Sequence, residues 1–328
     1  MPKYWMITNR NVDASGLGNH RAEKLKFYTA DNGPIDQISS WTLLKDKGAI
    51  KAEEIFSKAL TAETSQFPKV DSMEHEQQKH VTLFVHGYNN DWKDAAIRYK
   101  QITDDIHTKN DLGICILFTW PSNGQTAHYL ADRDDARASG PALSQVFNLL
   151  YDQAMKMQLL ASRSNVTCNA KVSVIAHSMG NWVLQNALKY TWERYNKPLL
   201  VSLINQCVMV AADVDNDLFA GGDAVGGGAS EGMANLCYRI TALYTRKDSV
   251  LGMSAGLKHF GKRRLGRSGL DREVAQPDNV WDCDCSTLFK PGEKNFHSAY
   301  FWSPKIQNVL QAVLKGQDRG IINAKHGA

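Results

Sequence analysis

Short apolar runs recur along the chain, and in most of them nearly every residue is apolar. A strand that is buried on both faces has this pattern, because neither set of alternating side chains meets water. Residues 81–85 and 114–120 are the strongest examples. Strands are predicted in these two runs and also at residues 4–7, 25–28, 172–177, 207–211, 238–244 and 280–286.

Between these runs, apolar residues are spaced three or four apart, which is the period of one helix face. The clearest case is the last, with apolar positions at Ile306, Val309, Leu310, Val313 and Leu314. Helices are predicted there and near residues 52–60, 92–107, 143–150 and 181–190. Apolar strands that alternate with helices indicate a parallel sheet covered on both sides. The expected fold class is therefore α/β, with a doubly wound, mostly parallel sheet and helices on both faces.

Length and composition favour one domain. The chain has 328 residues, of which 43% are hydrophobic and 22% are charged, and these are ordinary values for a globular protein. It contains no low-complexity tract, no internal repeat and no linker rich in Pro, Gly and Ser. We therefore expect a single domain over residues 1–328, with an N-terminal elaboration over residues 1–78.

Charge and cysteine content argue against several classes of function. A net charge of +4 is too small to indicate a nucleic-acid partner. The N-terminal residues lack the apolar stretch of a signal sequence and no later segment approaches a membrane span, so we expect a cytoplasmic protein without integral membrane association. Cys283 and Cys285 are a close pair without a second pair to complete a metal site. No metal and no cofactor are expected.

A serine at the end of an apolar run is the strongest candidate for chemistry. Ser178 follows residues 172–177, is flanked two positions away by Ala176 and Gly180, and precedes a predicted helix. This pattern is typical of a nucleophile elbow, in which a sharp turn from strand to helix raises a serine hydroxyl above the sheet. The flanking residues are small because strand and helix pass close together. Ser178 is the predicted nucleophile, and an ordinary turn serine is the alternative.

A serine nucleophile needs a base that accepts its proton. In this type of fold the acid and then the histidine follow the serine along the chain, and His259, His297 and His326 satisfy that order. His326 lies in the C-terminal tail, and His259 lies in a basic stretch with no strand directly before it. His297 lies between a predicted strand and the last helix. His297 is therefore the predicted base.

Two aspartates are candidates for the acid that orients His297. Asp248 follows the predicted strand at residues 238–244 after a short turn, and Asp213 ends the preceding strand. A carboxylate in either place can accept the ring proton of His297 and fix its tautomer. Asp248 has the commoner location and is the predicted acid. Asp213 is the alternative, and without that role it would cap a helix or orient the turn at Ser178.

A serine that attacks a carbonyl group also needs donors for the negative charge that develops on the carbonyl oxygen. One is expected from the amide after the nucleophile and the other from a loop that follows an earlier strand. His86 and Gly87 follow the apolar run at residues 81–85, and Gly87 permits an unusual backbone conformation. The backbone amides of Tyr88 and Met179 are therefore predicted to form the oxyanion hole. His86 is expected to organise the loop by hydrogen bonding.

With these motifs in order, the chain resembles the α/β-hydrolase superfamily, and more narrowly a group of bacterial α/β-hydrolases catalogued as a domain of unknown function. The resemblance implies a serine-hydrolase fold with esterase-like activity. Its motifs span nearly the whole chain. They are ITNR at 7–10, LFVHGYN at 83–89, FTWPS at 118–122, AHSMG at 176–180, ADVD at 212–215, YTRKD at 244–248 and the loop of His297.

Many relatives insert a helical cap where this chain has a segment rich in glycine. We therefore expect a short glycine-rich loop over residues 216–236 in place of a large cap, and a rather open site. Trp120, Tyr129 and Phe219 are predicted to contact substrate, with packing in the core as the alternative for each. The basic residues within 258–267 are interpreted as a solvated loop, with an acidic ligand or another subunit as the alternative.

The predicted function is a serine hydrolase that cleaves carboxylic esters, small or lipid-like, through an acyl-enzyme. Ser178 attacks, His297 transfers protons and Asp248 orients His297. A thioesterase or amidase that uses the same residues is one alternative. A binding protein that keeps the hydrolase fold without turnover is the alternative of another class.

Overall fold

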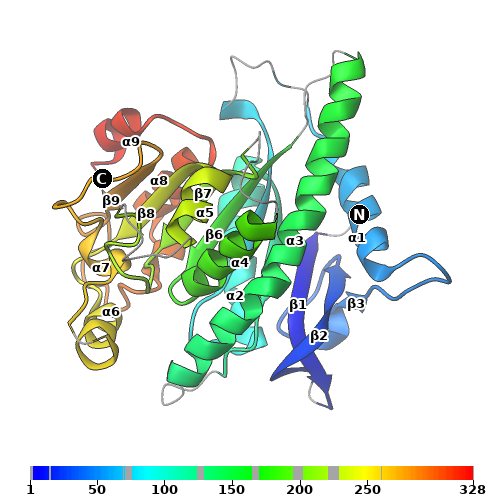
Figure 1. The fold of residues 1–328 in the computed structure, drawn as a ribbon, viewed down its shortest axis with the longest axis horizontal. Coiled ribbons are helices and arrows are strands. Elements are labelled where there is room, and N and C mark those ends of the chain that lie inside the picture. The colour runs from blue at the N-terminus through cyan, green and yellow to red at the C-terminus, as the bar shows by residue number, and fades with distance from the viewer. Residues whose placement is uncertain are drawn as a thin grey trace.

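The computed structural model describes residues 3–14, 16–68, 70, 76–123, 129–164, 170–194, 202–220, 229–259 and 261–327. Its strands form one sheet of nine in the order β3-β2-β1-β5-β4-β6-β7-β8-β9 (Figure 1). The β1–β2 and β2–β3 pairs are antiparallel and the other neighbouring pairs are parallel. The strands are β1 (Tyr4–Asp13), β2 (Gly16–Ala30), β3 (Thr42–Leu43), β4 (His80–Val85), β5 (Gly113–Thr119), β6 (Lys171–His177), β7 (Ile204–Val210), β8 (Cys237–Tyr244) and β9 (Val280–Asp284).

Helices connect the strands and lie on both sides of the sheet. The α-helices are α1 (Ala52–Thr64), α2 (Trp92–Gln101), α3 (Tyr129–Ser164), α4 (Gly180–Arg194), α5 (Ala229–Leu236), α6 (Ser249–Met253), α7 (Leu265–Ser268), α8 (Pro304–Leu314) and α9 (Arg319–His326). Shorter helical segments of other types are η1 (Ile38–Ser40), η3 (Ile102–His107), η4 (Thr108–Asn110), η6 (Ser254–Lys258) and η7 (Ala299–Phe301).

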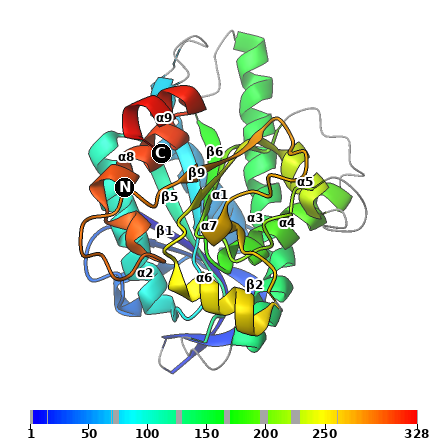
Figure 2. The same ribbon diagram turned by 90° about the vertical axis from the view of Figure 1, so that its left-hand side faces the viewer.

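Two apolar cores, one on each face of the sheet, hold these layers together. Along β4, Leu83 and Val85 pack in one core, and Phe84 packs in the other. Side chains of α1, α3, α4 and α5 complete the first core, and those of α2, α8 and α9 complete the second. Figure 2 shows α3, α4 and α5 on one side of the sheet and α2, α8 and α9 on the other. Because both faces are buried, strand residues are apolar without alternation. The prediction of a doubly wound, mostly parallel α/β fold is confirmed.

Some elements differ from the sequence prediction. β2 begins at Gly16, well before the expected strand at residues 25–28. The sequence did not indicate this part because residues 19–24 are mostly polar and none of them is buried. α3 extends from Tyr129 to Ser164, far beyond residues 143–150. The predicted glycine-rich loop is helical in its last part, where α5 buries Met233 and Leu236. The glycines of that loop at 221, 222, 226, 227 and 228 lie outside the described residues.

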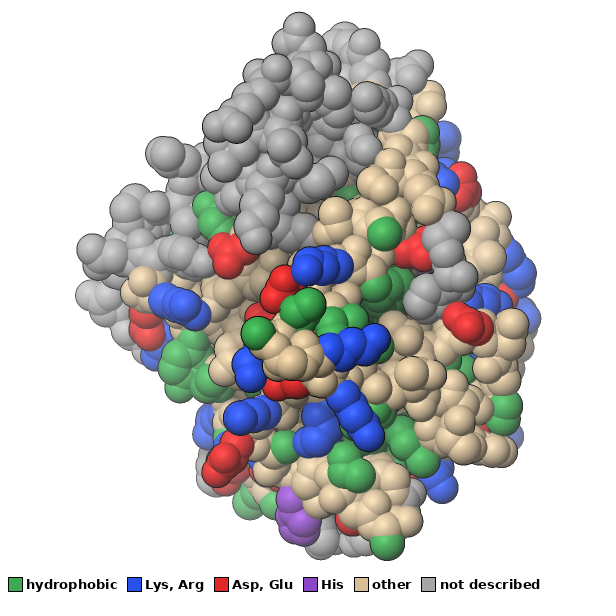
Figure 3. Space-filling model, turned by 90° about the vertical axis from the view of Figure 1, so that its right-hand side faces the viewer, with side chains coloured by type: hydrophobic (Ala, Val, Ile, Leu, Met, Phe, Trp, Pro, Cys, Tyr) green, Lys and Arg blue, Asp and Glu red, His purple; other side chains and the backbone are tan. Residues whose placement is uncertain are grey.

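The sheet ends at β3, which is only two residues long. The segment that follows it exposes Lys45 and Lys47, and Lys51 forms an ion pair with Asp46 at 3.1 Å. Lysine and arginine side chains gather on this side of the molecule (Figure 3). A short edge strand flanked by charged side chains resists pairing with the strand of another chain. This edge is therefore protected against aggregation.

Four buried histidines make the fold sensitive to acid. Burial lowers the pKa of His80 and of His86 to about 3, that of His107 to about 4, and that of His177 well below its usual range. Each stays neutral in the folded chain at pH 5, whereas the unfolded chain takes up a proton at each below about pH 6.5. The unfolded state then binds more protons, so stability falls as the pH falls below about 6.5.

We expect the free energy of unfolding in urea to decrease on acidification from pH 6.5 to 5, with a limiting slope of about 1.4 kcal/mol per pH unit for each of these histidines. In His80→Asn the slope should be smaller by about one histidine's share, because Asn does not titrate and its amide can still bond the hydroxyl of Ser173, 2.7 Å from Nδ1 of His80. Urea titrations at several pH values measure both slopes. A flat profile in the unaltered protein would contradict this account.

Candidate active site

The sharp turn expected at Ser178 is present between β6 and α4. Ser178 has a φ of 52°, in the left-handed region that residues other than glycine rarely adopt. The packing there is tight. A Cβ atom on Gly180 would lie 2.4 Å from the carbonyl oxygen of His86, and one on Gly87 would lie 2.8 Å from Cβ of Ser178. The turn therefore presses Ser178 against the loop that follows β4, and glycine is required on both sides of the contact.

Ser178, His297 and Asp248 meet although they are far apart in the sequence. Nε2 of His297 lies 2.9 Å from Oγ of Ser178, and Nδ1 of His297 lies 2.7 Å from Oδ2 of Asp248. Ser178 follows β6 and Asp248 follows β8, and the carboxyl ends of parallel strands share one edge of the sheet. If Nδ1 donates its hydrogen to the carboxylate, Nε2 presents a lone pair to the hydroxyl. This arrangement can transfer a proton from Ser178 to His297.

Asp248 is held firmly behind His297. Its side chain is fully buried, and its Oδ1 accepts a hydrogen bond from the amide of Leu251 at 2.9 Å. This bond caps the N-terminus of α6. The second oxygen is left to His297, which is 13% exposed and so reaches the surface of the site. The cap therefore fixes the carboxylate in the position that meets the imidazole.

Asp213 bonds to a different set of side chains. Its Oδ1 accepts hydrogen bonds from Nε of Arg264 and from Oγ of Ser254, both at 2.9 Å. Its Oδ2 accepts one from the hydroxyl of Tyr129 at 2.7 Å. Asp213 is 2% exposed and Arg264 is fully buried, so the two form an internal ion pair. Of the two candidate acids, the structure brings Asp248 to the imidazole and pairs Asp213 with the arginine.

The interpretation of residues 258–267 as a solvated loop is wrong for two of their arginines. Arg264 lies in the interior and also binds the carboxylate of Asp215. The guanidinium of Arg267 donates to the backbone carbonyl of Asp248. These contacts could not be predicted from the sequence, because the partners of both arginines follow strand ends that are distant along the chain. The segment therefore supports the candidate site from inside the protein.

The loop after β4 lies beside Ser178. Tyr88 and Asn89 line the space over the serine, and Asn89 has a φ of 57°. Met179 precedes α4, at the helix end where backbone amides have no acceptor within the helix. The partial positive charge of this helix end favours an anion. The backbone on both sides of Ser178 is therefore suited to an oxygen that becomes negative.

Arg10 is a buried residue for which the sequence predicted no role. Its guanidinium donates to Oγ1 of Thr119 at 3.0 Å and to the carbonyls of Ser122 and Asn90 at 3.3 and 3.2 Å. Burial lowers its pKa to about 10. The motif at residues 118–122 and Asn90, which directly follows the motif at residues 83–89, thus meet around this cation. Its place in the motif ITNR at residues 7–10 was the sequence signal for it.

His86 and Trp120 brace the same loop. Their rings are stacked, with centroids 5.2 Å apart and an angle of 6° between the planes. The indole N–H of Trp120 donates to the carbonyl of His86 at 2.8 Å, and the Trp120 amide donates to Nε2 of His86 at 3.1 Å. Because burial lowers the pKa of His86, its ring stays neutral and accepts this bond. The pair is suited to holding the loop in shape.

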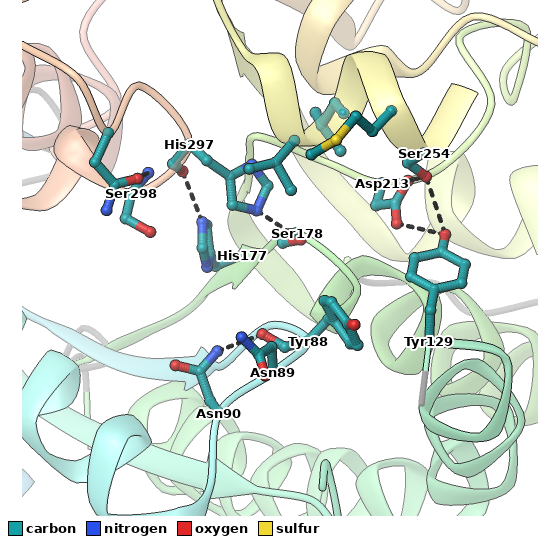
Figure 4. Close-up of a pocket in the computed structure, with 14 residues that line it drawn as sticks. Tyr88, Asn89, Asn90, Tyr129, His177, Ser178, Asp213, Ser254, His297 and Ser298 are labelled. Atoms are coloured by element: carbon teal, nitrogen blue, oxygen red, sulfur yellow. Dashed lines mark hydrogen bonds between the residues drawn. The ribbon is translucent and has the colours of Figure 1, made fainter. Parts of the chain in front are cut away.

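A cavity of about 430 Å³ opens over Ser178 (Figure 4). Of the three aromatic residues predicted to contact substrate, Tyr129 lines it. Trp120 and Phe219 are 0% and 3% exposed, belong to the core and do not line the cavity. The sequence did not indicate several other lining residues, because most of them come from loops and from α6, and His177 comes from the end of β6. These are Asn90, His177, Val250, Leu251, Met253, Ser254, Asn295 and Ser298.

His177 is the second histidine in the cavity. Its Nε2 lies 2.9 Å from the backbone carbonyl oxygen of His297, and the two rings are 4.9 Å apart (Figure 4). A carbonyl oxygen only accepts, so Nε2 of His177 carries the hydrogen. Burial, with the nearby His297, lowers the pKa of His177 and keeps it neutral. His177 therefore ties the loop of His297 to the end of β6.

Within the described residues, no helix combines the length and the apolar character needed to cross a membrane.

Comparison with known proteins gives a family match and more distant likenesses. Residues 61–311 match the family described as alpha/beta hydrolase of unknown function (DUF900). The uncharacterized protein alr1448 of Nostoc sp. (strain PCC 7120) is 24% identical over an alignment of 377 positions. The alignment covers 94% of this chain and 92% of that protein.

Two solved structures show a fold likeness at low sequence identity. Phospholipase PlaB from Legionella pneumophila has a TM-score of 0.43 and 14% identity, with 75% of this chain and 61% of that chain covered. Lipase B from Aspergillus fumigatus has a TM-score of 0.42 and 15% identity, with 82% and 61% covered. The match thus spans less than two thirds of either protein, and likenesses of this degree bear on neither substrate nor reaction.

The family match covers most of the chain, and it agrees with the wound sheet and with the turn at Ser178. This chain belongs to the family of alpha/beta hydrolases of unknown function.

Proposed function

We propose that this hydrolase cleaves carboxylic esters through an acyl-enzyme formed on Ser178. The observation that carries the proposal is the pair of hydrogen bonds that joins Ser178 to His297 and His297 to Asp248, at 2.9 and 2.7 Å. A serine hydroxyl is a weak nucleophile until a base takes its proton. His297 is the base and Asp248 orients it.

In the proposed reaction, a side chain of the site or a water molecule takes part in each bond that forms or breaks. Oγ of Ser178 attacks the ester carbonyl carbon while its proton passes to Nε2 of His297. His297 then gives that proton to the leaving alcohol oxygen as the bond from carbon to that oxygen breaks. Water attacks the acyl-enzyme, again with His297 as base, and the acid is released as Ser178 regains its proton. Asp248 stabilises the imidazolium at both stages without being protonated.

The backbone amides of Tyr88 and Met179 bind the oxyanion in this proposal. The cramped positions of Gly87 and Gly180 support it, because they hold the loop after β4 against the turn at Ser178. Donors that are fixed in advance stabilise the transition state without reorganising. The braces formed by Arg10 and by the stack of His86 on Trp120 maintain this loop.

We expect His177→Phe to lower kcat about tenfold with little change in KM, because the variant loses the bond that positions the loop of His297. His177→Gln keeps an N–H donor at a similar reach and should recover most of the rate. Steady-state kinetics on a short para-nitrophenyl ester, with pH profiles of kcat, measure this. Equal losses in both variants, or a loss confined to KM, would count against the positioning role.

The class of bond is tested with matched acyl donors. Wild-type protein is assayed on an oxygen ester, a thioester and an anilide that share one acyl group, with Ser178→Ala as the blank. We expect turnover of the oxygen ester to exceed that of the other two, each relative to its rate in buffer. A higher acceleration of the thioester or anilide would reassign the substrate. No Ser178-dependent turnover of any donor would support a binding protein.

A further inference from the structure

Beside Ser178, the cavity has a polar wall made of Tyr129, Asp213 and Ser254. These three side chains and His297 lie on opposite sides of the serine (Figure 4). The wall takes no part in the proton transfers described above. The carboxylate of Asp213 nonetheless lies at the cavity, although removing its charge from water costs free energy. Such a group next to a nucleophile is suited to reading a feature of the substrate.

The number of hydrogens on each side chain of the wall decides which atoms donate hydrogen bonds and which accept them. The hydroxyl of Ser254 donates to Oδ1 of Asp213, and the hydroxyl of Tyr129 donates to Oδ2. Each hydroxyl carries one hydrogen, so both are already committed. Nε2 of His259, 2.7 Å from the Tyr129 oxygen, must then be a donor to it. Burial and the charge of Asp213 raise the pKa of Tyr129 and keep it protonated.

The wall can still accept a hydrogen bond, at the carboxylate of Asp213. A carboxylate oxygen accepts two hydrogen bonds. Oδ1 of Asp213 has two, from Ser254 and from Arg264, whereas Oδ2 has one, from Tyr129, among the described residues. Arg264 compensates the charge of Asp213 from the interior. A ligand that meets this wall is therefore favoured if it donates a hydrogen bond, and is penalised if it has only acceptors.

The position of His297 decides which part of an ester meets the wall. The leaving oxygen must approach Nε2 of His297, because that atom returns the proton to it. An acyl chain that extends away from His297 then meets the side of Ser178 on which Asp213 lies (Figure 4). α6 contributes the apolar residues Val250, Leu251 and Met253 to the same cavity. The acyl side thus combines apolar lining with one acceptor site.

We infer that the preferred acyl group is a hydroxyacyl chain whose hydroxyl donates to Asp213. This inference rests on the proposed ester hydrolysis and names its substrate class. An apolar stem fits against α6, and the hydroxyl supplies the hydrogen that the wall lacks. Tyr129 and Ser254 are then specificity residues that aim the carboxylate.

The test compares three para-nitrophenyl ester series of increasing chain length, with acyl chains that end in a methyl, a hydroxyl or a methoxy group. At one chain length we expect kcat/KM for the hydroxyl ester to exceed that of its methyl and methoxy counterparts at least about tenfold. The methoxy ester is the matched control, because it is polar but donates no hydrogen. Methyl esters preferred at every length would overturn the inference and leave the proposed hydrolysis intact. Inactivity on all three series would overturn both.

Variants connect the preference to the wall. In Asp213→Asn an N–H donor replaces an acceptor, so the ratio of hydroxyl to methoxy turnover should fall at least about tenfold. Ser254→Ala, which perturbs the interior less, removes a donor to Oδ1 of Asp213 and frees a second acceptor site, so it should raise the same ratio and serves if Asp213→Asn does not fold. Ser298→Ala removes a hydroxyl from another part of the cavity lining and should leave the ratio unchanged. A ratio unaffected by both wall variants would contradict the inference.

Discussion

Ser178→Ala should lower the turnover of para-nitrophenyl butyrate about 10⁴-fold or more while the protein stays folded. The substitution removes the atom that would form the acyl bond. It leaves the turn between β6 and α4, since alanine and serine tolerate a φ of 52° about equally. Initial rates against a buffer blank measure the loss. The melting temperature and circular dichroism of the variant are the controls for folding.

Asp248→Asn should lower kcat about 10⁴-fold, because an amide at this position favours the wrong tautomer of His297. Asp213→Asn should instead lower stability, since it removes one partner of the buried pair with Arg264, a change that costs about 3–5 kcal/mol. Kinetics and urea unfolding of both variants separate the two roles. If Asp213→Asn lost the greater part of kcat and Asp248→Asn did not, the acid would be reassigned to Asp213.

Much of the fold could be predicted because the central strands are buried on both sides. The run at residues 114–120 cannot form an exposed strand, and the helix at residues 306–314 has one apolar face. The length of β2 was underestimated because residues 19–24 within it are mostly polar and none of them is buried. In α9 Ile322 is the buried residue, so the sequence carried almost no apolar period there. Helices and strands that bury few apolar side chains show little apolar periodicity in the sequence.

The candidate site could be predicted where its residues directly follow strands and occur in the order serine, acid, histidine along the chain. Ser178, His297 and Asp248 were predicted on that basis. The side chain of His297 lies within hydrogen-bonding distance of Ser178 on one side and of Asp248 on the other. The partners of Arg264 and Arg10 were not predictable, because side chains from separate loops meet only after folding. The same applies to the cavity lining that α6 supplies. Local patterns indicate where a nucleophile stands, and long-range packing decides what surrounds it.

Labelling with a fluorophosphonate followed by mass spectrometry tests the central claim most directly, because the reagent reacts with a serine that a neighbouring base activates. The account predicts a single phosphonyl adduct on Ser178 in the wild-type protein, much slower labelling in His297→Ala, and no adduct at this position in Ser178→Ala. Folded wild-type protein that leaves Ser178 unlabelled, or that labels equally fast without His297, would contradict it.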